Sequence, residues 1–240
     1  MRTAISYFVI SFICLYLTNE SYSQNLQLSG GNNFSVALCD NQIVYAWGRN
    51  NLGQIGLNAS LSPYPAASYN TPQRVYGLPL IKQIDAGSGA HTIALACDNY
   101  VWVWGQNNCG QKGQGGAAPP ANCSCTDAAS PTPQRVLRGA ADAGFHDGTY
   151  LNNVRYVSGG NNSTYVILSN GQVMAWGENT YGQLGDGTNT HRNQPVYVLT
   201  GPGTRLQNIV QIEGGDDCAY ALDASGQVWS WGKNQGRELG

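Results

Sequence analysis

The segment VMAWGENTYGQLG at residues 173–185 occurs in four versions along this chain of 240 residues. The other versions are VYAWGRNNLGQIG (44–56), VWVWGQNNCGQKG (101–113) and VWSWGKNQGRELG (228–240). All four share V-x-x-W-G-x-N, and all but the last continue with G-Q-x-G. Successive tryptophans of this phrase are 57, 72 and 55 residues apart. Repeats of this length indicate a solenoid or a propeller built from similar units.

Each version follows a glycine-rich phrase and a short run of β-prone residues, such as TYVIL before the third version. Polar turn residues separate this run from the segment that ends in tryptophan, and two strands joined in this way predict a β-hairpin. Further short segments such as TPQRV and IVQIEGG bring each unit to about four strands, which is the content of a propeller blade. The expected turns are Asp40-Asn41, Asp98-Asn99, Asn170-Gly171 and Ser225-Gly226.

The repeat predicts four units, of which the last is incomplete. Two insertions rich in small residues explain the longest spacing between tryptophans, and we expect both to form loops at the rim or face of the propeller. The insertions are residues 114–131 and 138–153. The units cover about residues 26–76, 77–137, 153–199 and 206–240.

The glycine phrase, V-x-x-W-G-x-N-x-x-G-Q-L-G and P-x-x-V together resemble the repeat of the RCC1 (regulator of chromosome condensation) family. The resemblance covers nearly all of residues 26–240 apart from an insertion. It implies an all-β propeller with four-stranded antiparallel blades, usually seven of them, of which about four are present here. It also implies that the tryptophan fills space between blades and that the next glycine permits a tight backbone.

The fourth version departs from the family pattern, since Gly236 comes one place early and Glu238 stands where glutamine is usual. An arc of about four blades has two open faces and exposed strand edges, which favour unwanted pairing with other chains. We therefore expect the sequence to be a fragment of a longer protein. The alternative is a homodimer that closes one ring, if the chain ends at residue 240.

The N-terminus has the pattern of a secretory signal peptide over residues 1–23. Arg2 precedes an uncharged, mostly apolar run from Ala4 to Thr18, and the small-x-small triplet that ends at Ser23 predicts cleavage there. The apolar run is shorter than the roughly 20 residues that a membrane-spanning helix needs, so a membrane anchor is the less favoured alternative. The predicted mature chain, residues 24–240, has no membrane span. We expect it to be secreted or held in the cell envelope, as in exported bacterial proteins.

The composition favours a turn-rich β protein outside the cytoplasm. The chain has 31 glycines, and only 11% of its residues are charged. A net charge of −2 provides no basic field, so a nucleic-acid partner is not expected. Six cysteines follow the signal and permit up to three disulfides in 15 pairings; a local Cys109–Cys123 bridge is one candidate. The six are Cys39, Cys97, Cys109, Cys123, Cys125 and Cys218.

The sequence predicts no enzyme, no cofactor and no catalytic, cofactor-binding or metal residue. The histidines, His91, His146 and His191, stand at scattered positions, and His91 occupies a repeated place in the glycine phrase that we assign to the fold. GDGTNT at 185–190 and Asp216-Asp217 lack the alternating acidic residues and closing glutamate of a calcium loop. No base, acid or nucleophile stands out as a catalytic set.

The favoured function is an exported binding or adhesion module whose loops recognise a protein or a surface glycan. The insertions 114–131 and 138–153 are the first candidates for that surface. Two alternatives follow from resemblance. An exported propeller of the β-lactamase inhibitor protein II type plugs an enzyme active site, which suggests an inhibitor of a secreted enzyme. The best-known activity of the RCC1 family is guanine-nucleotide exchange on the GTPase Ran, against which the signal peptide and the mild acidity argue.

Overall fold

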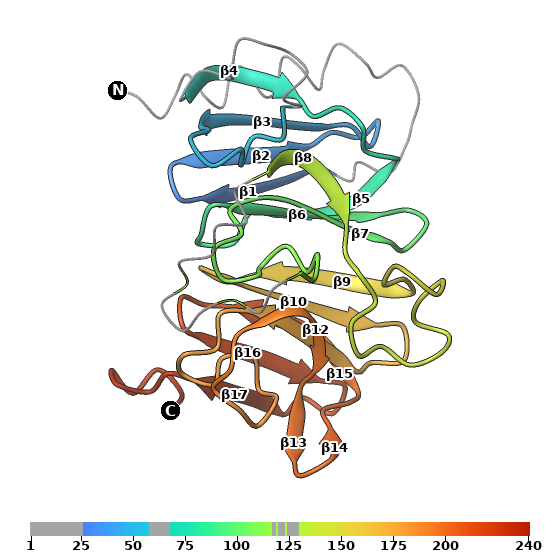
Figure 1. The fold of residues 1–240 in the computed structure, drawn as a ribbon, viewed down its shortest axis with the longest axis vertical. Helices are drawn as coiled ribbons and strands as arrows, with labels where there is room; N and C mark the ends of the chain where they lie inside the picture. Colours follow the sequence, from blue (N-terminus) through green and yellow to red (C-terminus); the bar gives the residue numbers. More distant parts are fainter. Residues whose placement is uncertain (1–25, 58–67, 117–118, 120–122, 124–129) are drawn as a thin grey trace.

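The computed structural model describes residues 26–57, 68–116, 119, 123 and 130–240 (Figure 1). In these ranges the chain forms strands and loops, and none of it is a helix with the length and apolarity that crossing a membrane requires. The predicted signal peptide lies outside the described residues, as does most of the insertion 114–131.

Four antiparallel sheets follow one another along the chain, and their strands pair in sequence order. Each is one blade, which confirms the predicted all-β architecture; the fourth sheet has three strands among the described residues. The first blade contains β1 (Gln27–Gly31), β2 (Phe34–Leu38), β3 (Val44–Arg49) and β4 (Ser68–Arg74), and the second contains β5 (Ile81–Asp85), β6 (His91–Ala96), β7 (Val101–Gly105) and β8 (Ser130–Arg135). The third blade contains β9 (Val154–Gly159), β10 (Ser163–Leu168), β11 (Val173–Gly177) and β12 (Arg192–Tyr197). The fourth contains β15 (Ile209–Gly214), β16 (Cys218–Asp223) and β17 (Val228–Gly232).

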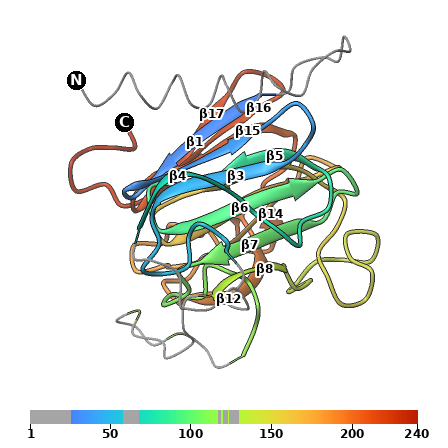
Figure 2. The same ribbon diagram turned by 90° about the horizontal axis from the view of Figure 1, so that it is seen from above.

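The blades lie face to face in chain order, from the first at the top of Figure 1 to the fourth at the bottom. Each blade begins with its innermost strand, and these first strands contact one another across neighbouring blades. The view from above separates β1, β5 and β15 from the outer strands β8 and β12, which lie at the opposite edge (Figure 2). The four blades therefore form an arc of a propeller with its inner strands along one side.

Three hydrophobic cores fill the spaces between neighbouring blades. In the first core Ile84 and Trp104 of the second blade pack with Val36 and Val44 of the first. The other two cores repeat this arrangement between later pairs of blades. Trp104 and Trp176 are fully buried, which confirms that the repeated tryptophan fills the space between blades.

The Trp-Gly step coincides with an irregularity in strand pairing. The register between β11 and β12 shifts between Ala175 and Gly177, and the same shift occurs in the two preceding blades. Gly177 has a φ of 110°, and a Cβ atom there would lie 2.2 Å from the carbonyl oxygen of Asn162. Only glycine fits this backbone and this contact, so the Trp-Gly step changes the direction of the strand next to the tryptophan.

The first hairpin turn lies where the sequence predicted it: Asp40 and Asn41 are its central residues, and the amide of Gln42 closes it on the carbonyl of Cys39 at 2.8 Å. One local detail differs from the sequence prediction. A short extra hairpin, β13 (Leu199–Gly201) with β14 (Thr204–Arg205), follows the third blade. Its turn contains Pro202-Gly203, and this pair favours a turn strongly enough to make a hairpin where only a connection was expected.

Candidate functional site

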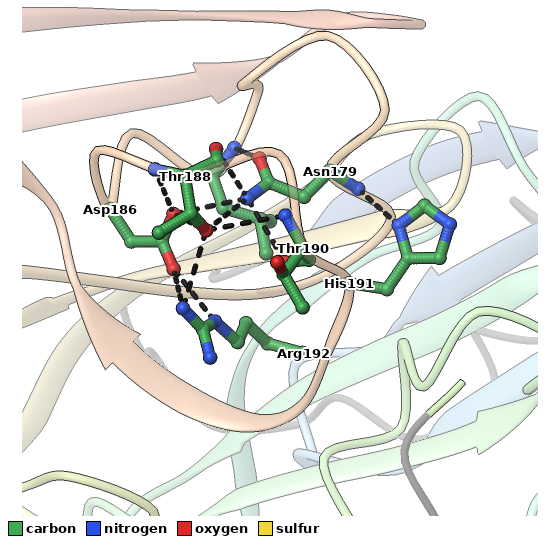
Figure 3. Close-up of polar contacts among 7 residues, drawn as sticks. Asn179, Asp186, Thr188, Thr190, His191 and Arg192 are labelled. Atoms are coloured by element: carbon green, nitrogen blue, oxygen red, sulfur yellow. Dashed lines mark hydrogen bonds and ion pairs between the residues drawn. The ribbon is translucent and has the colours of Figure 1, made fainter. Parts of the chain in front are cut away.

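The loop between β11 and β12 contains a cluster of polar contacts, and Asn179 lies at its centre (Figure 3). The Asn179 side-chain carbonyl accepts a hydrogen bond from the amide of Leu184 at 2.9 Å. Its amide nitrogen lies 3.0 Å from Asp186 Oδ1 and 2.9 and 3.1 Å from the carbonyl oxygens of Thr188 and Thr190, and its two N–H groups are shared among these three acceptors. One buried asparagine therefore fixes the whole loop.

Asp186 completes this cluster and uses its carboxylate for the fold. It accepts hydrogen bonds from the amide and hydroxyl of Thr188, and Arg192 pairs with it at 2.6 Å. Burial by itself raises the pKa of Asp186, but the hydrogen bonds from Thr188 and Arg192 outweigh that effect and leave the pKa below its ordinary value. The acidic residue of the GDGTNT segment is thus held by protein donors. Asp217 is likewise paired, with Lys233 at 2.8 Å.

Asn179→Ala should lower the free energy of unfolding by about 1–3 kcal/mol, because it leaves the buried Leu184 amide and two loop carbonyls without their partner. Chemical denaturation of the purified variant measures this loss. Asn170→Ala is the matched control, since Asn170 is exposed in a hairpin turn. Equal stabilities for the two variants would contradict the role assigned to Asn179.

The same loop meets two cysteines of the second blade's long loop. Cys109 and Cys123 are joined through their sulfur atoms, which lie 2.09 Å apart. The Nε2 atom of His191 lies 3.6 Å from the sulfur of Cys123. A carboxylate oxygen of Glu178 lies within 4.8 Å of both sulfur atoms. The structure thus brings together two of the predicted cysteines and one of the scattered histidines.

The hydrogen bonding of His191 argues against a metal centre at this cluster. Its Nδ1 accepts a hydrogen bond from the amide of Asn179 at 2.9 Å, so the neutral ring carries its proton on Nε2. That proton points toward Cys123, and Nε2 then has no lone pair for a metal ion. The arrangement suits a disulfide that fastens residue 123 to the second blade.

His91 lies where the repeat analysis assigned it, inside the fold. It is fully buried between the second and third blades, and its Nε2 lies 3.1 Å from Thr164 Oγ1. Burial lowers the pKa of His91 to about 4, although the carboxylate of Asp85 and the backbone of Ser163 act in the opposite direction. The side chain is therefore neutral at physiological pH and inaccessible to a substrate.

The insertion at 138–153 is a loop, as predicted, and aromatic contacts hold it in place. The guanidinium of Arg135 lies over the rings of Tyr100 and Tyr150, 4.4 and 5.7 Å from their centres. The hydroxyl of Tyr100 donates to Asp147 at 3.1 Å. Two isolated bridges, Leu137 with Tyr150 and His146 with Leu151, close the base of the loop.

A second set of contacts fixes the tip of this loop to the third blade. Arg205 on the β13–β14 hairpin forms an ion pair with Asp142, and its guanidinium lies 3.6 Å from the ring centre of Tyr197. The hydrogen bond from Arg205 lowers the pKa of Asp142. The amide of Asp142 donates to the Tyr197 hydroxyl at 3.1 Å. The loop is thereby pinned at both ends while Asp142–Gly144 and Asp147–Thr149 remain exposed.

Comparison with known families agrees with this architecture. The profile described as "Regulator of chromosome condensation (RCC1) repeat" matches residues 43–95 and 170–222, and a second profile of the same description matches 26–54, 81–111 and 154–183. The chain belongs to the RCC1 repeat family. Among relatives of this RCC1-repeat chain, human HERC3, a probable E3 ubiquitin-protein ligase, is 32% identical over 219 residues. Human HERC6, also a probable E3 ubiquitin-protein ligase, is 30% identical over 217 residues.

These matches cover about 90% of the RCC1-repeat chain but under a fifth of each relative, 18% of HERC3 and 19% of HERC6. Solved structures show the same fold. Human WBSCR16 superimposes with a TM-score of 0.68 at 23% identity, over 90% of this chain and 49% of that protein. Yeast RCC1 (Prp20) superimposes with a TM-score of 0.65 at 21% identity, over 90% of this chain and 45% of that protein. The RCC1-repeat chain thus spans about half of these propellers.

The sequence analysis identified the insertion at 138–153 but missed the contact between His191 and Cys123. Sixty-eight residues separate these two, and each belongs to a different blade. A signal was available in the repeat itself, because equivalent loops of neighbouring blades stack on the same side of a propeller. Cys109 and Glu178 each come shortly after a repeated tryptophan, which places both of them in such loops.

Proposed function

We propose that this chain is an exported binding or adhesion module without catalysis of its own, and that it recognises a protein or a surface glycan. The observation that carries the proposal is the pinned loop at 138–153. Its carboxylates Asp142 and Asp147 are held by Arg205 and Tyr100, while the segments Asp142–Gly144 and Asp147–Thr149 are exposed to solvent. A loop that is already fixed loses little conformational entropy when it binds, so its contacts contribute more of their energy to affinity.

Export is supported by the signal-like residues 1–23 and by the Cys109–Cys123 pair, because disulfides persist mainly in oxidising compartments. The HERC relatives are probable ligases as whole proteins, of which this chain spans less than a fifth. A ligase activity therefore has no support in the repeats themselves. Binding through repeats is the property that such a segment can carry alone.

A matched pair of substitutions tests the binding surface. Ala143→Arg adds a bulky charge to the exposed tip of the loop, and Ala224→Arg adds the same group to an exposed turn of the fourth blade. We expect Ala143→Arg to weaken binding at least tenfold, about 1.4 kcal/mol, and Ala224→Arg to leave it unchanged. The measurement is binding of the labelled protein to intact envelopes of the expressing cells and to a printed glycan array.

Each result of this experiment bears on the proposal. Equal binding by both variants would place the recognition surface elsewhere than the loop. Absence of saturable binding to both probes would contradict the adhesion proposal and favour a soluble target such as a secreted enzyme. The same cells test export, since a chain that stays in the cytoplasm with residues 1–23 attached would contradict that part.

A further inference from the structure

Arg135 is an arginine whose positive charge is in contact with aromatic rings. It lies on β8, directly opposite Trp102 of β7. Its guanidinium lies over the rings of Tyr100, Trp102 and Tyr150, at 4.4, 5.3 and 5.7 Å from their centres. Ring faces attract a cation, but they offer no lone pair to its N–H groups. The rings therefore hold the guanidinium in place without satisfying its donors.

Two buried N–H donors at this spot have no acceptor. Within the described residues, Nε of Arg135 and Nε1 of Trp102 both lack a hydrogen-bond partner, and Arg135 takes part in none of the ion pairs. Trp104, two residues further along the same strand, instead donates its indole N–H to a backbone carbonyl at 3.0 Å. Because a buried donor without a partner is costly, the Arg135–Trp102 pair favours an acceptor supplied from outside.

A carboxylate lies at the edge of the same group of side chains. Asp147 is exposed and accepts hydrogen bonds from the amides of Tyr150 and Thr149 at 2.7 and 2.9 Å and from the Tyr100 hydroxyl at 3.1 Å. The amide of Tyr150, followed by that of Thr149, lowers the pKa of Asp147, so the group is ionised at neutral pH. The spot thus offers a cationic donor and, beside it, an anionic acceptor.

An acidic sugar fits this combination of groups. A pyranose ring has a C–H face that packs on aromatic rings, and its hydroxyls donate to a carboxylate. The carboxylate of a uronic or sialic acid accepts charge-assisted hydrogen bonds from arginine. Tyr100, Trp102 and Tyr150 are each half-buried, so each ring keeps some exposed surface.

A protein partner suits the spot less well. Stable protein interfaces are large and have an apolar centre. Among the described residues, none of the large exposed apolar side chains lies in the loop at 138–153. A small, charged and aromatic surface favours a sugar unit over a protein surface.

We propose that the Arg135 cluster, meaning Tyr100, Trp102, Arg135, Asp147 and Tyr150, binds a carboxylate-bearing sugar unit of a surface glycan. The Arg135 guanidinium donates to the sugar carboxylate, Asp147 accepts from a sugar hydroxyl, and the rings contact the sugar face. All five residues belong to the second blade and the loop that follows it. The inference rests on the proposed binding function and names the ligand class and its place.

Two matched pairs of sugars test the charge without altering the protein. Tetragalacturonate and its full methyl ester have the same rings and secondary hydroxyls, but the ester has no carboxylate. Sialyllactose and lactose form the second pair and distinguish a sialic from a uronic acid. In titration calorimetry with the full purified chain, we expect the acid of one pair to bind about tenfold or more tightly than its neutral counterpart.

A matched pair of variants assigns this preference to one arginine. Arg135→Gln should abolish the preference for the acid while the affinity for the neutral sugar stays nearly the same. Arg74→Gln is the control, because Arg74 has the same place in the first blade, opposite Tyr45, and lies 5.2 Å from the ring centre of Tyr76. It should keep the preference. A loop that was only loosened would weaken both sugars and leave their ratio unchanged.

The outcomes separate this inference from the wider proposal. Equal affinity for acid and neutral sugars in the unaltered chain, or a preference that survives in Arg135→Gln, would overturn the acidic-sugar site and leave the binding function standing. Binding to cell envelopes that disappears when the envelopes are treated with protease, without binding to any of the four sugars, would overturn it in favour of a protein target. Absence of binding to sugars and envelopes alike would contradict both proposals.

Discussion

Trp176→Ala should lower the free energy of unfolding by about 3–5 kcal/mol, the usual cost of removing a fully buried aromatic side chain. The ring lies in the core between the second and third blades, and its indole donates to the Gln111 carbonyl at 2.8 Å. A Cβ atom at Gly113 would lie 2.9 Å from the indole nitrogen, so the neighbouring loop is shaped around this ring. Loss of the ring leaves a cavity that the stiff loop cannot fill.

Trp47→Ala is the matched control for this prediction. Trp47 occupies the same place in the repeat, but no blade precedes it among the described residues, and its side chain is only half-buried. Its loss should cost clearly less, because a half-buried ring has fewer contacts to lose. Urea unfolding followed by tryptophan fluorescence measures both. A loss below about 1 kcal/mol for Trp176→Ala would contradict its assignment to the core.

The repeat made the fold predictable because its signals are local and recur. A Trp-Gly step, a polar hairpin turn and a glycine phrase each constrain a few adjacent residues, and four copies reinforce one another. The blades and the buried tryptophans follow from these signals. The extra hairpin β13–β14 was not predicted because it occurs once, so no second copy revealed it.

The candidate surfaces were harder to predict because they depend on contacts between blades. The sequence marked 138–153 as an insertion, but nothing local indicated that Arg205 would hold Asp142 across 63 residues. His191 and Cys123 meet for the same reason, through the stacking of loops from neighbouring blades. Single-sequence patterns describe what each blade contains, and the register between blades decides which side chains meet.

His91 should make the stability of the chain fall as the pH decreases from about 6.5 to about 4. Its folded pKa is about 4, whereas the unfolded side chain takes up a proton near its ordinary value of 6.5. Within this window the unfolded state binds a proton that the folded state excludes, so acid favours unfolding. The slope approaches about 1.4 kcal/mol per pH unit, and the full effect is about 3 kcal/mol. Above pH 7 this contribution is constant.

His91→Gln separates this titration from the packing role of the ring. Glutamine keeps a donor for Thr164 Oγ1 but has no proton to gain, so unfolding free energies measured by urea between pH 4.5 and 7.5 should lose most of this slope. His146→Gln, in the loop at 138–153, removes a less buried histidine and should keep the slope. An unchanged slope in His91→Gln would mean that other groups govern the acid sensitivity. A flattened slope would show that the fold keeps this imidazole neutral in exchange for lower stability in acid, which is a structural role and not a catalytic one.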